Sequence, residues 1–311
     1  MEPLASAAAC GKVILFGEHA VVYRRPALAV PLTQVQATAT IEPGEAGITI
    51  DAPDLNQSVS LDRASPASPL AAIVRLTLAH LQRQPDTLRL KITINSTVPI
   101  ASGLGSGAAV STAIVRALAQ WAQATLDEAT VSTLVFEVEK LHHGTPSGID
   151  NTVIAYQQSV YFVRDEPIQL FNVATPFTVV IGNTGVAGST KVAVSDVRKG
   201  WEADRAQYEA WFDQIGAIVQ QARSAIESGA IDQLGPLMDQ NQALLRHINV
   251  SGPELERLIA AAKGAGAAGA KLVGGGRGGN MIALVTEQNV TAVSAALKDA
   301  GAVSLIVTEI S

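Results

Sequence analysis

Polar residues interrupt the apolar pattern of this chain at a few short turns, and one of them suits phosphate binding. The glycine-rich turn from Pro99 to Ala109 runs directly into an alanine-rich helical pattern over 110–122. A helix that begins between Gly105 and Ala108 presents backbone N–H groups and the positive end of its dipole, and glycines let a phosphate approach the backbone. The turn therefore predicts a polyphosphate cradle, with simple packing of a Gly/Ser turn against a buried helix as the alternative. It is neither a Walker A loop nor the dinucleotide G-x-G-x-x-G turn.

Phosphoryl transfer explains the other polar turns as well. The reaction needs Mg²⁺ with oxygen ligands, a cation near the reacting oxygens and a carboxylate that orients or deprotonates the attacking hydroxyl. Lys12 is the candidate cation, Asp150 the candidate carboxylate, and Ser106 and Glu139 the candidate Mg²⁺ ligands. Taken singly, each charged residue is better explained as an ordinary surface or turn residue. Their occurrence together favours the chemical interpretation.

The elements around these turns alternate between strand and helix patterns in the first half of the chain. Ser68 and Pro69 are a candidate N-cap and first-turn residue for the first helix. Pro43 and Gly44 mark a turn between two strands that alternate like an antiparallel pair. We expect strands over 12–16, 36–41, 47–51 and 86–95, helices over 69–81 and 127–140, and a strand pair over 153–163.

The second half of the chain is richer in helical patterns. Ser251 is a candidate N-cap, and 264–279 contains a second dense glycine loop. We expect strands over 177–181, 281–285 and 304–309, and helices over 192–228, 231–248, 252–263 and 288–300. The pattern predicts an α+β chain of two lobes, with domains over 1–165 and 166–311 that meet in the charged turn Arg164–Pro167.

Composition limits the classes of protein that this chain can belong to. With 311 residues, 48% hydrophobic content and one cysteine, Cys10, it has the apolar content for two cores and no disulfide framework. The net charge of −6, with only 22 Lys and Arg residues, argues against a nucleic-acid partner. No apolar run approaches the roughly 18 residues of a membrane span, and the first residues lack a basic leader region. We therefore expect a globular, cytoplasmic protein without a membrane partner.

Four stretches in order resemble the motifs of the GHMP kinases, most closely those that act on mevalonate, and the resemblance spans nearly the whole chain. They are 11–23, with Gly17-Glu18-His19; 99–109; Glu139 followed by 143–151, with Ser147-Gly-Ile-Asp150; and 271–284. The resemblance implies a ribosomal-S5-like α/β N-terminal lobe, an α+β C-terminal lobe and a site in the cleft. It also implies ATP and Mg²⁺ as cofactors and a small-molecule acceptor, and it leaves a homodimer open.

The same resemblance assigns roles residue by residue. Asp150 matches the catalytic aspartate, ionised beside Lys12, and Ser106 and Glu139 match the Mg²⁺-holding positions. The positions matched to the nucleotide phosphates are Pro99, Gly103, Leu104, Gly105, Ser106, Gly107 and Ala108. The positions matched to the acceptor are Glu18, His19, His143 and Ser147. Thr190, in a Gly-Ser-Thr loop, is a weaker candidate that we leave outside the site.

The acceptor that the resemblance favours is mevalonate, phosphorylated on its C5 hydroxyl in isoprenoid precursor synthesis. In galactokinases the residues after Gly-Glu-His resemble Thr-Asp-Tyr, which supply groups that read a sugar. Residues 20–23 of this chain are Ala-Val-Val-Tyr, an apolar stretch that suits a short branched acid. Phosphomevalonate kinases tend to carry tyrosine at the place of His19. A kinase for phosphomevalonate or a sugar is the first alternative. A nucleotide-binding regulator without catalysis is the second, and the joint presence of Lys12, Glu139 and Asp150 speaks against it.

Several positions depart from the family pattern. Gly107 replaces a second serine, and Cys10 stands where a proline is usual. Arg24 replaces a glycine, so its turn is expected not to need a positive φ. Arg277 also replaces a glycine. In the same loop, Val273 and Asn280 differ from the family pattern as well. Two interpretations of Arg277 stay open: its guanidinium binds a phosphate oxygen, or it points into solvent without effect on the chemistry.

Overall fold

The computed structural model describes residues 3–100, 103–143 and 146–311, and the chain folds as two compact units. The first unit comprises the chain up to Lys12, Pro31–Ile100 and Gly105–Gln157. The second comprises Val13–Val30, the short segment that ends at Leu104, and Gln158–Ser311. Each unit is thus assembled from separate stretches of sequence. The division at 165/166 remains a sequence-based prediction.

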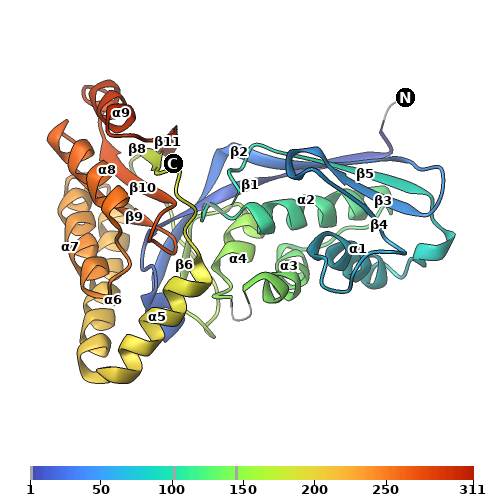
Figure 1. Ribbon diagram of the computed structural model, residues 1–311, viewed down its shortest axis with the longest axis horizontal. Coiled ribbons are helices and arrows are strands. Elements are labelled where there is room, and N and C mark those ends of the chain that lie inside the picture. The colour runs from blue at the N-terminus through green and yellow to red at the C-terminus, as the bar shows by residue number, and fades with distance from the viewer. Residues whose placement is uncertain (1–2, 101–102, 144–145) are drawn as a thin grey trace. The chain divides into compact units, whose positions relative to one another are not determined.

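The first unit packs helices along one face of a sheet whose strands run in the order β4-β3-β5-β2, with β1 also paired to β2 (Figure 1). The strands are β1 (Ala5–Phe16), β2 (Ala27–Pro43), β3 (Ile48–Ala52), β4 (Gln57–Ser60) and β5 (Leu90–Ser96); β1 and β2 each begin or end in the second unit. The helices are α1 (Pro69–His80), α2 (Ser106–Trp121), α3 (Glu128–His143) and α4 (Ile149–Tyr156), with short 3-10 turns η2 (Pro53–Leu55) and η3 (Pro85–Thr87).

Local sequence explains much of the first unit. Ser68 caps α1 as predicted, because its Oγ accepts the N–H of Ala71 and Pro69 occupies the first turn. Alternate residues of β2, among them Ala39 and Ile41, are fully buried, as expected of a strand with one covered face. The small residues of α2 are buried along nearly its whole length, which lets the helix lie close to its neighbours.

Two expectations for the first unit were wrong. The strands around Pro43 do not pair with each other, because β5 lies between them: Ile92 is opposite Ile41 in an antiparallel ladder and opposite Ile50 in a parallel one. Alternation predicts a strand but not its partner. Residues 153–156, expected as strand, belong to α4, because a short apolar run fits a buried helix as well as a buried strand.

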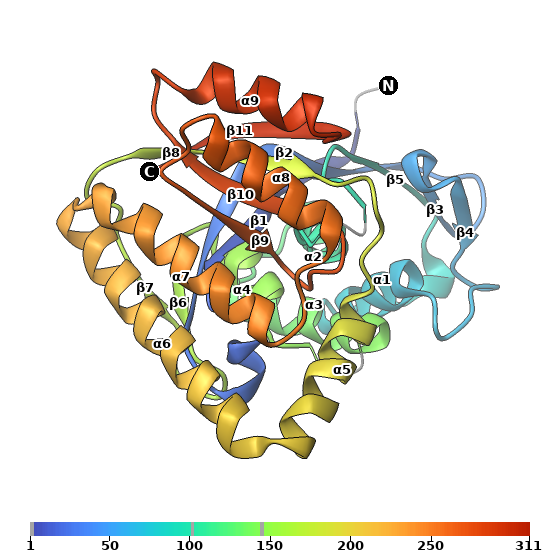
Figure 2. The same cartoon turned by 60° about the vertical axis from the view of Figure 1, so that its left-hand side comes forward.

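The second unit contains an antiparallel sheet in the order β11-β8-β10-β9, on which α7, α8 and α9 pack (Figure 2). Its strands are β6 (Val160–Phe162), β7 (Gln169–Leu170), β8 (Phe177–Asn183), β9 (Gly269–Val273), β10 (Asn280–Val285) and β11 (Ser304–Ile310). Its helices are α5 (Thr190–Ala203), α6 (Arg205–Ser228), α7 (Leu234–His247), α8 (Pro253–Gly264) and α9 (Val290–Asp299), with 3-10 turns η1 (Ala20–Tyr23) and η4 (Ile231–Gln233). The expected α+β class is confirmed.

Three details of the second unit differ from expectation. The helix expected over 192–228 is two helices, α5 and α6, because Asp204 ends the first and caps the second. β9 lies where the sequence predicted a glycine loop. The prediction failed because the buried residues Ala270–Val273 are a short apolar run with glycines on both sides. Ser251 does not cap α8. Gly252 is the N-cap residue, and Ser251 Oγ instead accepts a hydrogen bond from Gln242 Nε2 at 2.9 Å.

Candidate active site

Lys12 and Asp150 form an ion pair in the first unit. The Nζ atom of Lys12 lies 2.9 Å from Oδ1 of Asp150, and the lysine side chain is buried whereas the aspartate is about one-third exposed (30%). Lys12 comes from β1, and Asp150 lies in the first turn of α4, which begins after Gly148. The pair therefore joins two distant stretches of sequence and presents its carboxylate toward solvent.

The predicted glycine turn lies directly against this ion pair. α2 begins at Ser106, as expected, with Gly105 as its N-cap residue at φ 77°. A Cβ atom at Gly105 would lie 2.8 Å from Cδ1 of Ile154 and 3.1 Å from Cγ of Lys12. Because Ile154 follows Asp150 by one turn of α4, a side chain at Gly105 would push the turn away from both members of the pair. The first turn of α2 and the Lys12–Asp150 pair thus form one site.

Glu139, from α3, brings a second carboxylate to the same place. A Cβ atom at Gly107 would lie 3.2 Å from Oε1 of Glu139, so the carboxylate is next to the first turn of α2. Burial raises the pKa of Glu139 to about 7; the charge of Asp150 adds to the rise and Lys12 opposes it. A cation bound next to such a buried carboxylate would favour its ionised form.

The second unit holds Glu18 in a buried ion pair that the sequence did not predict. Oε1 of Glu18 contacts Nζ of Lys271, and both side chains are shielded from solvent, with exposed fractions of 1% and 0%. Lys271 Nζ also donates to the carbonyl of Leu272 at 2.7 Å. Burial lowers the pKa of Lys271, and the charge of Glu18 opposes that shift. The available signal was a lysine within the otherwise apolar strand β9.

His19, the neighbour of Glu18, is also buried, and its backbone lies in the left-handed region at φ 62°. Its Nε2 atom is 3.1 Å from the carbonyl oxygen of Gly275. Because a carbonyl can only accept, Nε2 carries the proton, and Nδ1 of the neutral ring is an acceptor. Burial lowers the pKa of His19 to about 4, so the ring is neutral near pH 7.

This shift predicts a pH-dependent stability. The folded chain binds a proton at His19 less readily than the unfolded chain, so stability is present above the ordinary pKa of 6.5 and is lost as the pH falls toward about 4. Between pH 7.5 and 4.5 the loss from this group should be about 2.5 kcal/mol. Urea unfolding of wild type and His19→Asn checks this, since asparagine tolerates a positive φ and does not titrate. Equal pH dependence of the two proteins would refute the assignment.

The remaining predicted residues are distributed as follows. Leu104 is buried, and Pro99, Gly103, Ser106 and Gly107 are half-buried. Ala108 lies inside the first turn of α2. Ser147 Oγ accepts the N–H of Ile149 at 3.3 Å, one residue before Asp150. His143 is the last residue of α3, and its side chain lies outside the described part of the structure. The roles assigned to all these residues stay predictions.

Two departures from the family pattern have outcomes in the structure. Arg24 has φ 63°, so the expectation that its turn avoids a positive φ was wrong: the arginine occupies the left-handed C-cap position of η1. Arg277 also has a positive φ, 56°. Its guanidinium does not point freely into solvent, because NH1 pairs with Asp196 Oδ2 at 2.5 Å and Nε donates to the Asn249 carbonyl at 3.1 Å.

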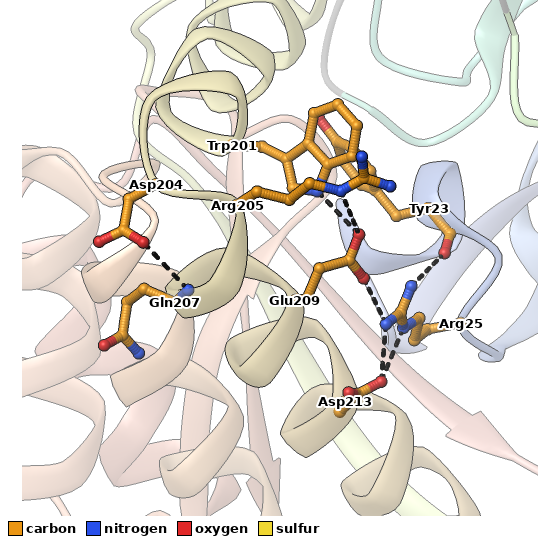
Figure 3. A network of polar contacts seen from close by, with 8 residues as sticks. All are labelled: Tyr23, Arg25, Trp201, Asp204, Arg205, Gln207, Glu209 and Asp213. Atoms are coloured by element: carbon orange, nitrogen blue, oxygen red, sulfur yellow. Dashed lines mark hydrogen bonds and ion pairs between the residues drawn. The ribbon is translucent and has the colours of Figure 1, made fainter.

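A polar network fixes the segment that follows His19 (Figure 3). Arg25 donates to Glu209 and Asp213 of α6 and to the carbonyl of Tyr23. Glu209 also accepts from Trp201 Nε1 of α5 at 2.9 Å, and the Tyr23 ring stacks on Phe212 at 4.3 Å. Trp201 also packs against the Tyr23 ring and the Arg205 guanidinium. The Glu18–His19 turn is therefore continuous with a firmly held segment.

Comparison with known families agrees with these motifs. The model for the GHMP kinases N terminal domain matches residues 71–159, and that for the GHMP kinases C terminal matches residues 222–303. Across the part of the chain that the structure describes, no helix has the length and apolar character needed to cross a membrane.

Relatives match along the full chain. The mevalonate kinase of Thermococcus sibiricus is 36% identical to this chain, and the match covers 100% of this chain and 97% of the relative. The mevalonate kinase of Pyrococcus horikoshii is 34% identical, and the match covers 96% of this chain and 94% of the relative. Among solved structures, L. major mevalonate kinase in complex with R-mevalonate has a TM-score of 0.86 at 30% identity, covering 99% of this chain and 98% of its own. Methanococcus jannaschii mevalonate kinase has a TM-score of 0.84 at 25% identity, covering 98% and 96%. Because motifs, family models and full-length relatives coincide, the chain belongs to the GHMP kinase family.

Proposed function

We propose that this chain transfers the γ-phosphoryl group of ATP to the C5 hydroxyl of mevalonate, giving 5-phosphomevalonate and ADP. The observation that supports this best is the contact of the Lys12–Asp150 pair with the first turn of α2 in a GHMP kinase. The full-length similarity to curated mevalonate kinases supports the choice of acceptor.

In the proposed reaction each group of the first-unit site has one task. The N–H groups of the first turn of α2, from Gly105 to Ala108, bind the phosphates. Asp150 aligns or takes the proton of the acceptor hydroxyl, whose oxygen forms a bond to the γ-phosphorus as the bond to the β–γ bridging oxygen breaks. The Lys12 ammonium stabilises the negative charge on the reacting oxygens.

The residues beside α2 also fit a magnesium ion. Among the described residues no three His, Cys, Asp or Glu side chains gather into a metal-binding cluster. Kinases hold Mg²⁺ through one or two side-chain oxygens and the substrate phosphates. Glu139, whose pKa is raised by burial and by Asp150, and the Ser106 hydroxyl would hold it. The ion would offset the negative charge of the phosphates during transfer.

On the second unit, the Glu18–His19 turn supplies the proposed acceptor contacts. The protonation state of His19 adds chemical detail, because its Nε2–H is used by Gly275 and Nδ1 remains as an acceptor. Such a ring receives a hydrogen bond from a hydroxyl and cannot donate one to a carboxylate. Mevalonate offers hydroxyl groups, which makes the arrangement compatible with the proposed acceptor.

An acceptor panel tests this function. ADP release is measured with ATP and Mg²⁺ and with mevalonate, phosphomevalonate or galactose, and kcat/KM for mevalonate should exceed the others by about 10²-fold or more. Chelation with EDTA should abolish turnover, and added Mg²⁺ should restore it. Turnover that is fastest with phosphomevalonate or a sugar would replace the acceptor but keep the family mechanism. Absence of turnover with every acceptor would favour the non-catalytic alternative.

A further inference from the structure

Helix α5 has few apolar anchors. Of its 14 residues only Ala193 and Val197 are buried. Helices in proteins are held mostly by an apolar face, so a helix with two buried residues depends on polar contacts for its position. One such contact is at its C-terminal end, where Trp201 donates to Glu209 within the network of Figure 3. The other is in its middle, where Asp196 pairs with Arg277.

Arg277 is held from three directions. Its backbone N–H donates to the Val250 carbonyl at 2.8 Å, its Nε donates to the Asn249 carbonyl at 3.1 Å, and its NH1 pairs with Asp196. A side chain in the left-handed region is disfavoured relative to glycine, the residue that the family pattern places here. These contacts offset that cost, and they connect the loop between β9 and β10 to α5 and to the segment after α7.

The same loop contacts His19. The Gly275 carbonyl accepts the His19 Nε2–H, and a Cβ atom at Gly275 would lie 2.7 Å from Oγ1 and 2.9 Å from Cα of Thr190, the first residue of α5. The backbone of this loop therefore touches the first turn of α5 on one side and orients the imidazole on the other. A shift of the loop moves both together.

We propose that Arg277 is a positioning residue for the acceptor site. Its ion pair with Asp196 fixes the first turn of α5 against Gly275, and through the Gly275 carbonyl it fixes the orientation of His19. Loss of the pair loosens the groups that face the acceptor and leaves the Lys12–Asp150 pair of the first unit unchanged. This inference rests on the proposed function of His19 in acceptor binding. Direct contact of Arg277 with a phosphate is the competing interpretation.

A double-mutant cycle tests the positioning role. Arg277→Gly and Asp196→Asn should each raise the KM for mevalonate about three- to tenfold, with kcat and the KM for ATP changed less than about twofold. The double variant should be no worse than Arg277→Gly alone, because both changes break one interaction. Arg277→Lys, which keeps the charge, should fall between Arg277→Gly and wild type. Lys199→Gln is the matched control, since Lys199 is the other partner of Asp196, at 2.9 Å, and its side chain is 73% exposed.

Three outcomes would overturn the inference. An unchanged KM for mevalonate in Arg277→Gly would show that the pair does not position the acceptor site. Additive effects in the double variant would show that the two residues act separately. A rise in the KM for ATP alone would show that Arg277 contacts the nucleotide directly.

A readout without substrate separates this inference from the proposed function. Amide hydrogen exchange over 193–197 of α5 should become about three- to tenfold faster in Arg277→Gly and remain unchanged in Lys199→Gln. If wild type prefers another acceptor, the proposed function fails, and the kinetic cycle is run with that acceptor. If exchange in α5 is unaffected by Arg277→Gly, the positioning role fails whichever acceptor is used.

Discussion

Replacing Asp150 with asparagine is expected to lower kcat by about three orders of magnitude. Asparagine keeps the size of the side chain, but it cannot take the hydroxyl proton and carries no charge opposite Lys12. The affinity for ATP should change little, because the proposed phosphate contacts are backbone N–H groups of the first turn of α2. Coupled ADP-release kinetics give kcat, and calorimetric titration with ATP and Mg²⁺ gives the affinity.

Asp165→Asn provides a matched control for this prediction. Asp165 also pairs with a cation at 2.9 Å, the Arg24 guanidinium, but both side chains of this pair are largely exposed, 61% for Asp165 and 73% for Arg24. This variant should keep the kcat of wild type. If Asp150→Asn retained more than about a tenth of wild-type turnover, Asp150 would supply far less than the factor of about 10²–10⁴ typical of a proton-transferring group, and the proposed mechanism would fail.

Replacing Lys271 with methionine is expected to lower the free energy of unfolding by about 3–5 kcal/mol. Methionine fills a similar volume, but the Glu18 carboxylate loses the cation that offsets its charge in a fully buried place. The cost should therefore come from the remaining charge rather than from a cavity. Denaturant unfolding at pH 7.5 measures it, with near-ultraviolet circular dichroism to confirm that the variant is folded.

The double variant Glu18→Gln/Lys271→Met separates the charge from other effects. With the buried charge removed, most of the lost stability should return, because a neutral pair avoids the desolvation of an ion. Lys263→Met is the control, since Lys263 and Asp239 also form a close ion pair but are exposed by 36% and 41%. An exposed pair of this kind should cost less than about 1 kcal/mol. A Lys271→Met variant as stable as Lys263→Met would contradict the prediction.

The sequence allowed good prediction where the signal is local. The start of α2 at Ser106 and the cap of α1 by Ser68 follow from glycine and serine at defined positions, and both are confirmed. The proximity of Lys12 and Asp150 could be predicted only through the order of the motifs, because nothing local links β1 to α4. The resemblance supplied that long-range information.

The failures share a different cause, which is dependence on tertiary partners. The insertion of β5 beside β3 is decided by pairing across the sheet, which alternation does not encode. Lys271 appeared only as the start of a motif, and its partner Glu18 lies 253 residues away. Arg24 has a positive φ because η1 ends there and is held by its neighbours, although residue type alone argues against it.

The assembly of each unit from separate stretches has a consequence for synthesis on the ribosome. Glu18 leaves the exit tunnel early, whereas Lys271 is 253 residues further along the chain. At about 5–20 residues per second, roughly 13 to 50 s of translation separate the two. The nascent second unit therefore cannot complete its fold until translation is almost finished, and neither unit can be obtained by cutting the gene once.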